Sequence, residues 1–78
     1  MIIKVTRADI QSGWRYSNAY CPVALAIKRT LKKSVTVGTT YCFVGALSRR
    51  LLPEVRQWIA DYDAGCWMQP FSFELETP

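Results

Sequence analysis

The sequence predicts a small α+β domain, in which a sheet of three to four strands carries two main helices packed on one face. Short β-branched or alternating segments occur at both ends and in the middle of the chain, and segments of helical periodicity separate them. The 78 residues are enough for one domain, spanning 1–78. The expected order is strand, short helix, helix, one or two strands, helix and strand (β-α-α-β(β)-α-β).

The first two elements follow from local signals. The run 2–5 is short and dominated by β-branched residues, which predicts a strand. Thr6 offers a helix-capping oxygen, and its spacing to Asp9 resembles a capping box. We therefore expect a short helix over 7–12 that ends at Gly13, followed by a loop over 14–20.

The second helix is expected over 23–33, after Pro22 at its first position, where no backbone N–H is needed. Its apolar positions recur on one face. Basic residues occupy the other faces and the last turn, where they suit the negative end of the helix dipole.

The β-rich stretch 34–44 allows two arrangements. One is a single long strand with an irregularity at Gly38, and the other is a hairpin with a three-residue turn over 38–40. Both place Tyr41 and Phe43 on the same apolar face as Val35 and Val37. A two-residue turn at Gly38–Thr39 is disfavoured because it moves the two aromatic residues to the other face.

After a turn at Gly45–Ala46, the segment 47–52 can add a short edge strand that bears Arg49 and Arg50.

The last helix has the clearest pattern. It starts at Pro53 and stops at Gly65, and its apolar residues recur at helical spacing. These residues are Val55, Trp58, Ile59 and Tyr62. A strictly alternating segment then predicts a terminal strand with Phe71, Phe73 and Leu75 facing the core.

The residue types present argue against catalysis. The chain has no histidine, which removes the commonest general base and metal ligand. Its three cysteines, Cys21, Cys42 and Cys66, have neither disulfide-framework nor zinc-site spacing, so we expect small buried hydrophobic residues. We therefore expect no enzyme, no cofactor and no metal.

Charge and hydropathy indicate the setting. The N-terminus lacks a signal-peptide pattern and the longest apolar run is far too short to span a bilayer, so we expect a soluble cytoplasmic protein without membrane contact. The net charge of +4 favours an anionic partner. The high apolar content leaves homo-oligomerisation open.

Three motifs along the chain resemble a family of small proteins encoded by phages and prophages. They are the "CPVALA" sequence at 21–26, an "FIxxFDxG"-like helix end at 58–65, and a "PFxFxL" ending at 70–75. Trp58 and Tyr62 stand where the family usually has Phe. The resemblance implies a fold, a phage origin and hence the host cytoplasm; it transfers no activity or site.

The first candidate site is the loop before the second helix, which combines aromatic rings with a guanidinium, a hydroxyl and an amide. Its proposed ligand-binding residues are Trp14, Arg15, Tyr16, Ser17, Asn18 and Tyr20. Aromatic faces stack on bases, and the helix N-terminus that follows can attract a phosphate or carboxylate. The alternative is that these aromatics cover a sheet edge or fill a dimer interface.

The second candidate is a basic set that could contact nucleic-acid phosphates. It comprises Lys28, Arg29, Lys32, Lys33, Arg49 and Arg50, joined by Arg56. The alternative is a solvated helix face. A third pair, Asp61 and Asp63, lies two residues apart and therefore not on one helical face, so acid–base pairing is not expected.

These features predict a non-enzymatic, phage-type accessory protein that binds or sequesters a host protein or an anionic, nucleotide-like ligand. The alternative prediction is a small basic nucleic-acid-binding protein.

Overall fold

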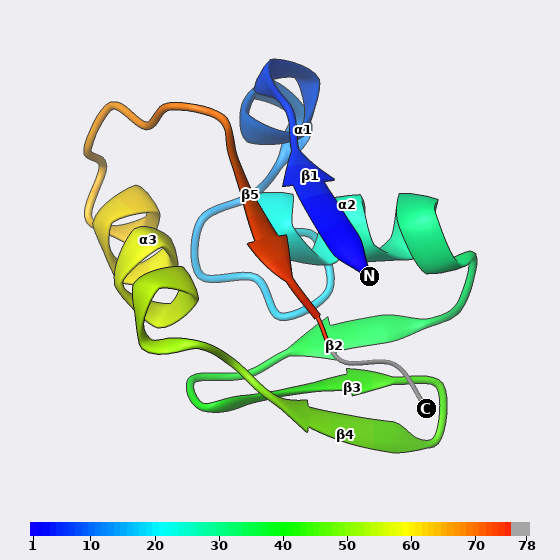
Figure 1. The fold of residues 1–78 in the computed structure, drawn as a ribbon. Helices are drawn as coiled ribbons and strands as arrows, with labels where there is room; N and C mark the ends of the chain where they lie inside the picture. The colour runs from blue at the N-terminus through cyan, green and yellow to red at the C-terminus, as the bar shows by residue number, and fades with distance from the viewer. Residues whose placement is uncertain (76–78) are drawn as a thin grey trace.

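The computed structural model describes residues 1–75 and has the predicted α+β architecture (Figure 1). In chain order the elements are β1 (Ile2–Val5), α1 (Arg7–Ser12), α2 (Pro22–Leu31), β2 (Val35–Val37), β3 (Tyr41–Val44), β4 (Leu47–Arg50), α3 (Pro53–Asp63) and β5 (Phe71–Glu74). Helix α2 ends two residues before the predicted boundary, because Lys32 adopts a left-handed conformation with φ of 55°. None of the described helices is both long and apolar enough to cross a bilayer.

The strands form two sheets, so the prediction of one sheet was wrong. β1 and β5 make an antiparallel pair that joins the two ends of the chain, and β2, β3 and β4 make an antiparallel meander. Helix α2 contacts both β1 and β2 and thereby serves both sheets. Helix α3 lies at the flank of this assembly instead of sharing one sheet face with α2 (Figure 1).

The middle of the chain is a hairpin, but its predicted apolar face was wrong. The backbone N–H of Gly38 donates to Tyr41 O at 2.8 Å, so the turn is at Thr39–Thr40 and Val37 lies opposite Cys42. This register buries Cys42 together with the β2 valines and exposes Tyr41 and Phe43 by about half. One residue of shift reverses every side chain of a strand, which is why hydrophobicity alone misassigned the face.

The core is built around α2. Val23, Ala24, Ala26 and Ile27 are fully buried between the two sheets. Valines of β1 and β2 and the apolar positions of β5 close around them, and α3 adds Val55 and Tyr62. Burial of each large aliphatic side chain contributes about 1.5–3 kcal/mol relative to exposure.

The capping box is present as predicted. The Thr6 hydroxyl accepts from the backbone N–H of Asp9 at 3.2 Å, and the Asp9 carboxylate accepts from the Thr6 N–H at 2.8 Å. Asp9 also pairs with Arg29 of α2, whose other terminal nitrogen donates to Lys4 O at 2.8 Å. Hydrogen bonds around Asp9 and Arg29 thus connect β1, α1 and α2.

Candidate functional site

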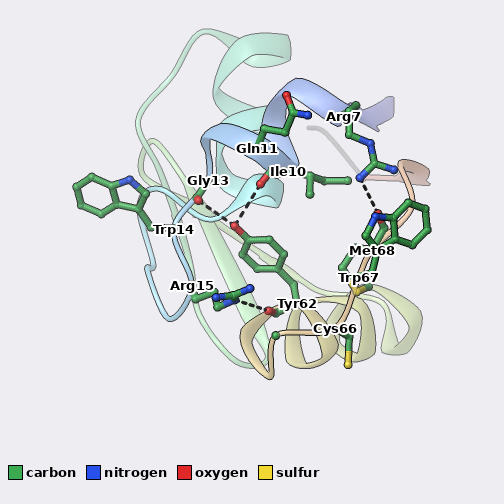
Figure 2. Close-up of a pocket in the computed structure, with 11 residues that line it drawn as sticks. Arg7, Ile10, Gln11, Gly13, Trp14, Arg15, Tyr62, Cys66, Trp67 and Met68 are labelled. Carbon is green, nitrogen blue, oxygen red and sulfur yellow. Dashed lines mark hydrogen bonds between the residues drawn. The ribbon is translucent and has the colours of Figure 1, made fainter.

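An open groove of about 830 Å³, which we call the Tyr62 groove, lies between α1 and the end of α3 (Figure 2). One wall is α1 with the start of the following loop, and the other is the end of α3 with the segment 65–68. The described lining residues are Arg7, Ile10, Gln11, Gly13, Trp14, Arg15, Tyr62, Gly65, Cys66, Trp67 and Met68. None of them is acidic, whereas two are arginines.

Tyr62 joins the two walls. Its buried ring comes from α3, and its hydroxyl donates to Gly13 O at 2.9 Å, with Ile10 O at 3.4 Å (Figure 2). Burial raises the pKa of the Tyr62 phenol, so the group stays neutral at physiological pH. Tyr62 and Ile10 therefore give the groove an apolar centre with a neutral polar edge.

Both lining arginines are fixed by carbonyl groups of the opposite wall. Arg7 Nη1 donates to Met68 O at 2.9 Å, and Arg15 Nε donates to Tyr62 O at 3.3 Å. A guanidinium has five N–H donors, so each side chain keeps donors beyond the one used here. Gly65 has a left-handed backbone conformation (φ 90°) and lies next to the Arg15 guanidinium. A Cβ added at Gly65 would lie 3.9 Å from Arg15 Nη2. The charges are thus positioned before any ligand contact.

Exposed tryptophans mark the two ends of the groove. Trp67 is 74% exposed and lies under the Arg7 guanidinium, 4.8 Å from ring centroid to Cζ. Trp14 is 64% exposed, points away from the cavity in Figure 2, and packs on Tyr20 with 5.1 Å between centroids. The two rings therefore do not sandwich one ligand, and Trp67 is the ring available beside a fixed cation.

The predicted loop site is divided between two cavities. Trp14 and Arg15 line the Tyr62 groove, whereas Tyr16, Ser17 and Asn18 line a separate cavity of about 360 Å³. The loop closes on itself through Trp14 N–H to Tyr20 O at 2.8 Å, and Val37 N–H donates to Asn18 O at 2.8 Å. Tyr20 packs between Trp14 and Lys28, whose Nζ lies 4.6 Å from the Tyr20 centroid.

The start of α2 does not offer the expected anion site, because its first turn is buried. Cys21, Pro22, Val23 and Ala24 are all buried, and the Cys21 sulfur accepts from the Ala24 N–H at 3.4 Å. The first turn packs in the core and caps itself, so that prediction was wrong.

The structure brings part of the predicted basic set together, since Arg49, Arg50 and Arg56 line one pocket of about 450 Å³. Lys28 donates to Ala19 O and Arg29 pairs with Asp9, so both have internal partners. Lys32 and Lys33 are exposed at the end of α2, and the Lys33 side chain lies close to Gly45. Arg50 lies three residues beyond the Gly45 end of β4, about 10 Å further along the strand.

The two aspartates of α3 have local roles. Asp61 accepts from the Gln57 amide at 3.0 Å, one helical turn away. Asp63 accepts from the backbone N–H of Tyr16 at 2.9 Å, a residue held in the left-handed region at φ 58°. Asp63 therefore anchors the loop that precedes α2.

Two of the three cysteines are buried, as predicted, and Cys66 is exposed, contrary to the prediction. Burial raises the pKa of the Cys21 and Cys42 thiols, which keeps them protonated and poorly nucleophilic at neutral pH. Within residues 1–75, no three side chains of the types His, Cys, Asp or Glu are grouped to hold a metal ion.

Sequence reasoning missed Arg7, Gln11 and Trp67. The long-range pairing of β1 with β5 brings α1 beside the segment that precedes β5, and no local pattern predicts that contact. The one local signal was Trp67, a large aromatic residue in a short connection between a helix and a strand.

Comparisons of this chain with protein-family models, with curated proteins and with solved structures found no match.

Proposed function

We propose that this protein is a non-enzymatic binding protein that holds an anionic, nucleotide-like ligand in the Tyr62 groove. The observation that carries the proposal is the pair Arg7 and Arg15, each tied to a carbonyl of the opposite wall, in a groove without an acidic residue among its described lining. Positioned guanidinium groups bind phosphate or carboxylate oxygens in paired hydrogen bonds.

The aromatic part of such a ligand has a matching surface. Trp67 presents an exposed ring beside the Arg7 guanidinium, and stacking of a base on such a ring is worth about 1–3 kcal/mol. Ile10 and Tyr62 supply apolar contact at the centre. A flat ring with an attached anion therefore matches the groove better than either part alone.

A binding role without turnover agrees with the residue types present. The sequence has no histidine, and burial raises the pKa of two of its thiols. The resemblance to small phage proteins supports a role in which sequestering the ligand, or a host factor that carries it, is the function itself. The alternative, nucleic-acid binding by the basic set, has less support, since Lys28 and Arg29 of that set already have internal hydrogen-bond partners.

The test is a titration with nucleoside mono-, di- and triphosphates and short oligonucleotides, followed by tryptophan fluorescence and backbone amide NMR shifts. Arg7→Gln and Arg15→Gln should each weaken binding by about tenfold or more, as expected for loss of a charged hydrogen bond. Lys33→Gln removes the same charge from an exposed position outside the groove and should leave affinity nearly unchanged.

Arg7→Lys separates recognition from folding, because it keeps the charge but loses the paired geometry. The groove proposal would be contradicted if both glutamine variants bind as wild type does while Lys33→Gln loses binding. That result would favour a site at the basic end of α2. Shifts that appear only when a protein partner is added would likewise contradict the small-ligand proposal.

A further inference from the structure

The three-stranded sheet carries two exposed aromatic rings on the face that points away from the core. Side chains alternate along β3, so Cys42 and Val44 are buried while Tyr41 and Phe43 point to the opposite face, where they are 47% and 51% exposed. Large apolar side chains that stay exposed together often mark an interaction surface. We call this surface the Tyr41–Phe43 face.

The neighbours of the two rings on this face leave them accessible. Thr36 of β2 and Ser48 of β4 lie opposite Phe43 on its two sides. Gly38 lies beside Tyr41, to whose carbonyl oxygen the Gly38 N–H donates at 2.8 Å. Phe43 therefore has only small hydroxyl residues beside it, and Tyr41 is open on its β2 side.

Arg50 adds a positive charge to the same face. It is exposed on β4 and lies directly opposite Tyr41, and the Cβ atoms of such a pair are about 4.5–5.5 Å apart. None of the residues of β2, β3 and β4 is acidic. The face therefore combines aromatic surface with positive charge and has no carboxylate from its own strands.

The size of the aromatic surface argues against a second copy of this chain as its partner. Two half-exposed rings together offer about the surface of one aromatic side chain, roughly 150–250 Å². A stable protein–protein interface buries about 800 Å² on each partner. A ligand that uses flat rings and a negative charge fits this face better than a second protein surface does.

We propose that the Tyr41–Phe43 face binds single-stranded nucleic acid. Residues i and i+2 of an antiparallel strand are about 6.8 Å apart, so Tyr41 and Phe43 offer two stacking surfaces, and a ligand with linked bases uses both. The Arg50 guanidinium pairs with a phosphate of the same strand. The net charge of +4 favours such a polyanion.

This face shares no residue with the described lining of the Tyr62 groove, so either proposal can fail without the other.

The test is an NMR titration of the whole protein with a short single-stranded thymidine oligonucleotide, in which the ring protons of Tyr41 and Phe43 are followed. Stacked bases should move these signals to higher field until the site is saturated. An abasic oligomer with the same number of phosphates is the matched probe and should bind more weakly, with little ring shift. Absence of ring shifts with the oligonucleotide, or equal shifts with the abasic oligomer, would overturn the proposal.

Variants at exposed positions separate stacking from charge. Tyr41→Leu and Phe43→Leu should each weaken binding by about fivefold or more, as expected for loss of one stacked base, whereas Tyr41→Phe keeps a ring and should bind nearly as wild type does. Arg50→Gln should lower the slope of log affinity against log salt by about 0.7. Lys4→Gln, which removes the same charge from an exposed position on β1, is the control and should leave affinity nearly unchanged. Equal affinity of Tyr41→Leu and Tyr41→Phe would contradict stacking.

Two other results would assign the oligonucleotide or the face differently. Ring shifts that appear when the protein concentration is raised without oligonucleotide would place a second copy on the face and overturn the proposal. Arg7→Gln changes the Tyr62 groove and should leave the ring shifts of Tyr41 and Phe43 unchanged. If Arg7→Gln abolished them, the oligonucleotide would be a ligand of the groove, and the proposal for this face would fail.

Discussion

At the scale of single residues, Asp9 shows how one buried charge can organise several elements. Its side chain is only 5% exposed, yet it accepts hydrogen bonds from the Thr6 backbone, the Thr6 hydroxyl and Arg29. Burial alone would raise the pKa of Asp9, but the hydrogen bonds from Arg29 and Thr6 outweigh it and the pKa is lowered.

Replacing this carboxylate should destabilise the protein. Asp9→Asn keeps the shape of the side chain but removes its charge and leaves one acceptor oxygen, where the carboxylate has one for Arg29 and one for the Thr6 N–H. We expect the free energy of unfolding to fall by about 1–3 kcal/mol, measured by urea denaturation. Asp61→Asn, which affects an exposed contact with Gln57, is the control and should change stability by less than about 0.5 kcal/mol.

The contribution of Asp9 should also depend on pH. A carboxyl with a lowered pKa binds fewer protons in the folded chain than in the unfolded chain, so its stabilising effect is complete above the ordinary value of 3.8. The effect is lost as the pH falls through the lower, folded-state value. The stability difference between wild type and Asp9→Asn should therefore shrink as the pH falls from 3.8 through the folded-state pKa; a difference that grows on acidification would contradict this account.

At the scale of an element, the end of α2 is set by backbone conformation. Lys32 occupies the left-handed region and donates its N–H to Lys28 O at 2.8 Å, which closes the last turn. A residue with a Cβ is strained in this region by about 1 kcal/mol, and glycine is not. The sequence has lysine at a position where helices usually end in glycine, so replacing this lysine with glycine should increase stability.

Lys32→Gly should raise the free energy of unfolding, and Lys32→Ala should not. Both variants lose the same charge near the helix end, so their difference isolates the relief of strain. We expect glycine to exceed alanine by about 1 kcal/mol, measured as the shift in urea midpoint. Equal stability of the two variants would show that Lys32 is unstrained.

At the scale of the whole molecule, α2 connects two sheets that have no described strand pairing between them. Ile27 is fully buried within the common core. Ile27→Ala should reduce stability by about 2–5 kcal/mol. Since α2 contacts both β1 and β2, far-UV circular dichroism and tryptophan fluorescence should still give coincident unfolding transitions. Two separate transitions would indicate that the sheets unfold independently.

The sequence was sufficient where the signal is local. The Thr6–Asp9 capping box, Pro22 and Pro53 at helix starts, and Gly65 at a stop identified elements whose boundaries the structure confirms within a few residues. The register of β3 could not be read, since Tyr41 and Cys42 are both apolar and a hydrogen bond at Gly38 decides between them.

Long-range pairing explains what was missed at the site. The pairing of β1 with β5 places Arg7 beside Trp67, sixty positions later in the chain, and no periodicity encodes that distance. The loop 14–20 was correctly singled out as irregular, but whether its side chains meet one cavity or two depends on how Asn18 docks on β2.

The hydrogen bonds of Arg7 and Arg15 across the Tyr62 groove should affect the kinetics of ligand binding. Because Arg7 and Arg15 each donate a hydrogen bond to a carbonyl of the opposite wall, the distance between the walls is fixed before a ligand binds. A ligand would meet arginine side chains that are already held in place, so the protein would lose little side-chain entropy on binding. Association should then proceed in a single exponential phase, with a rate that rises linearly with concentration and slows as added salt screens the attraction.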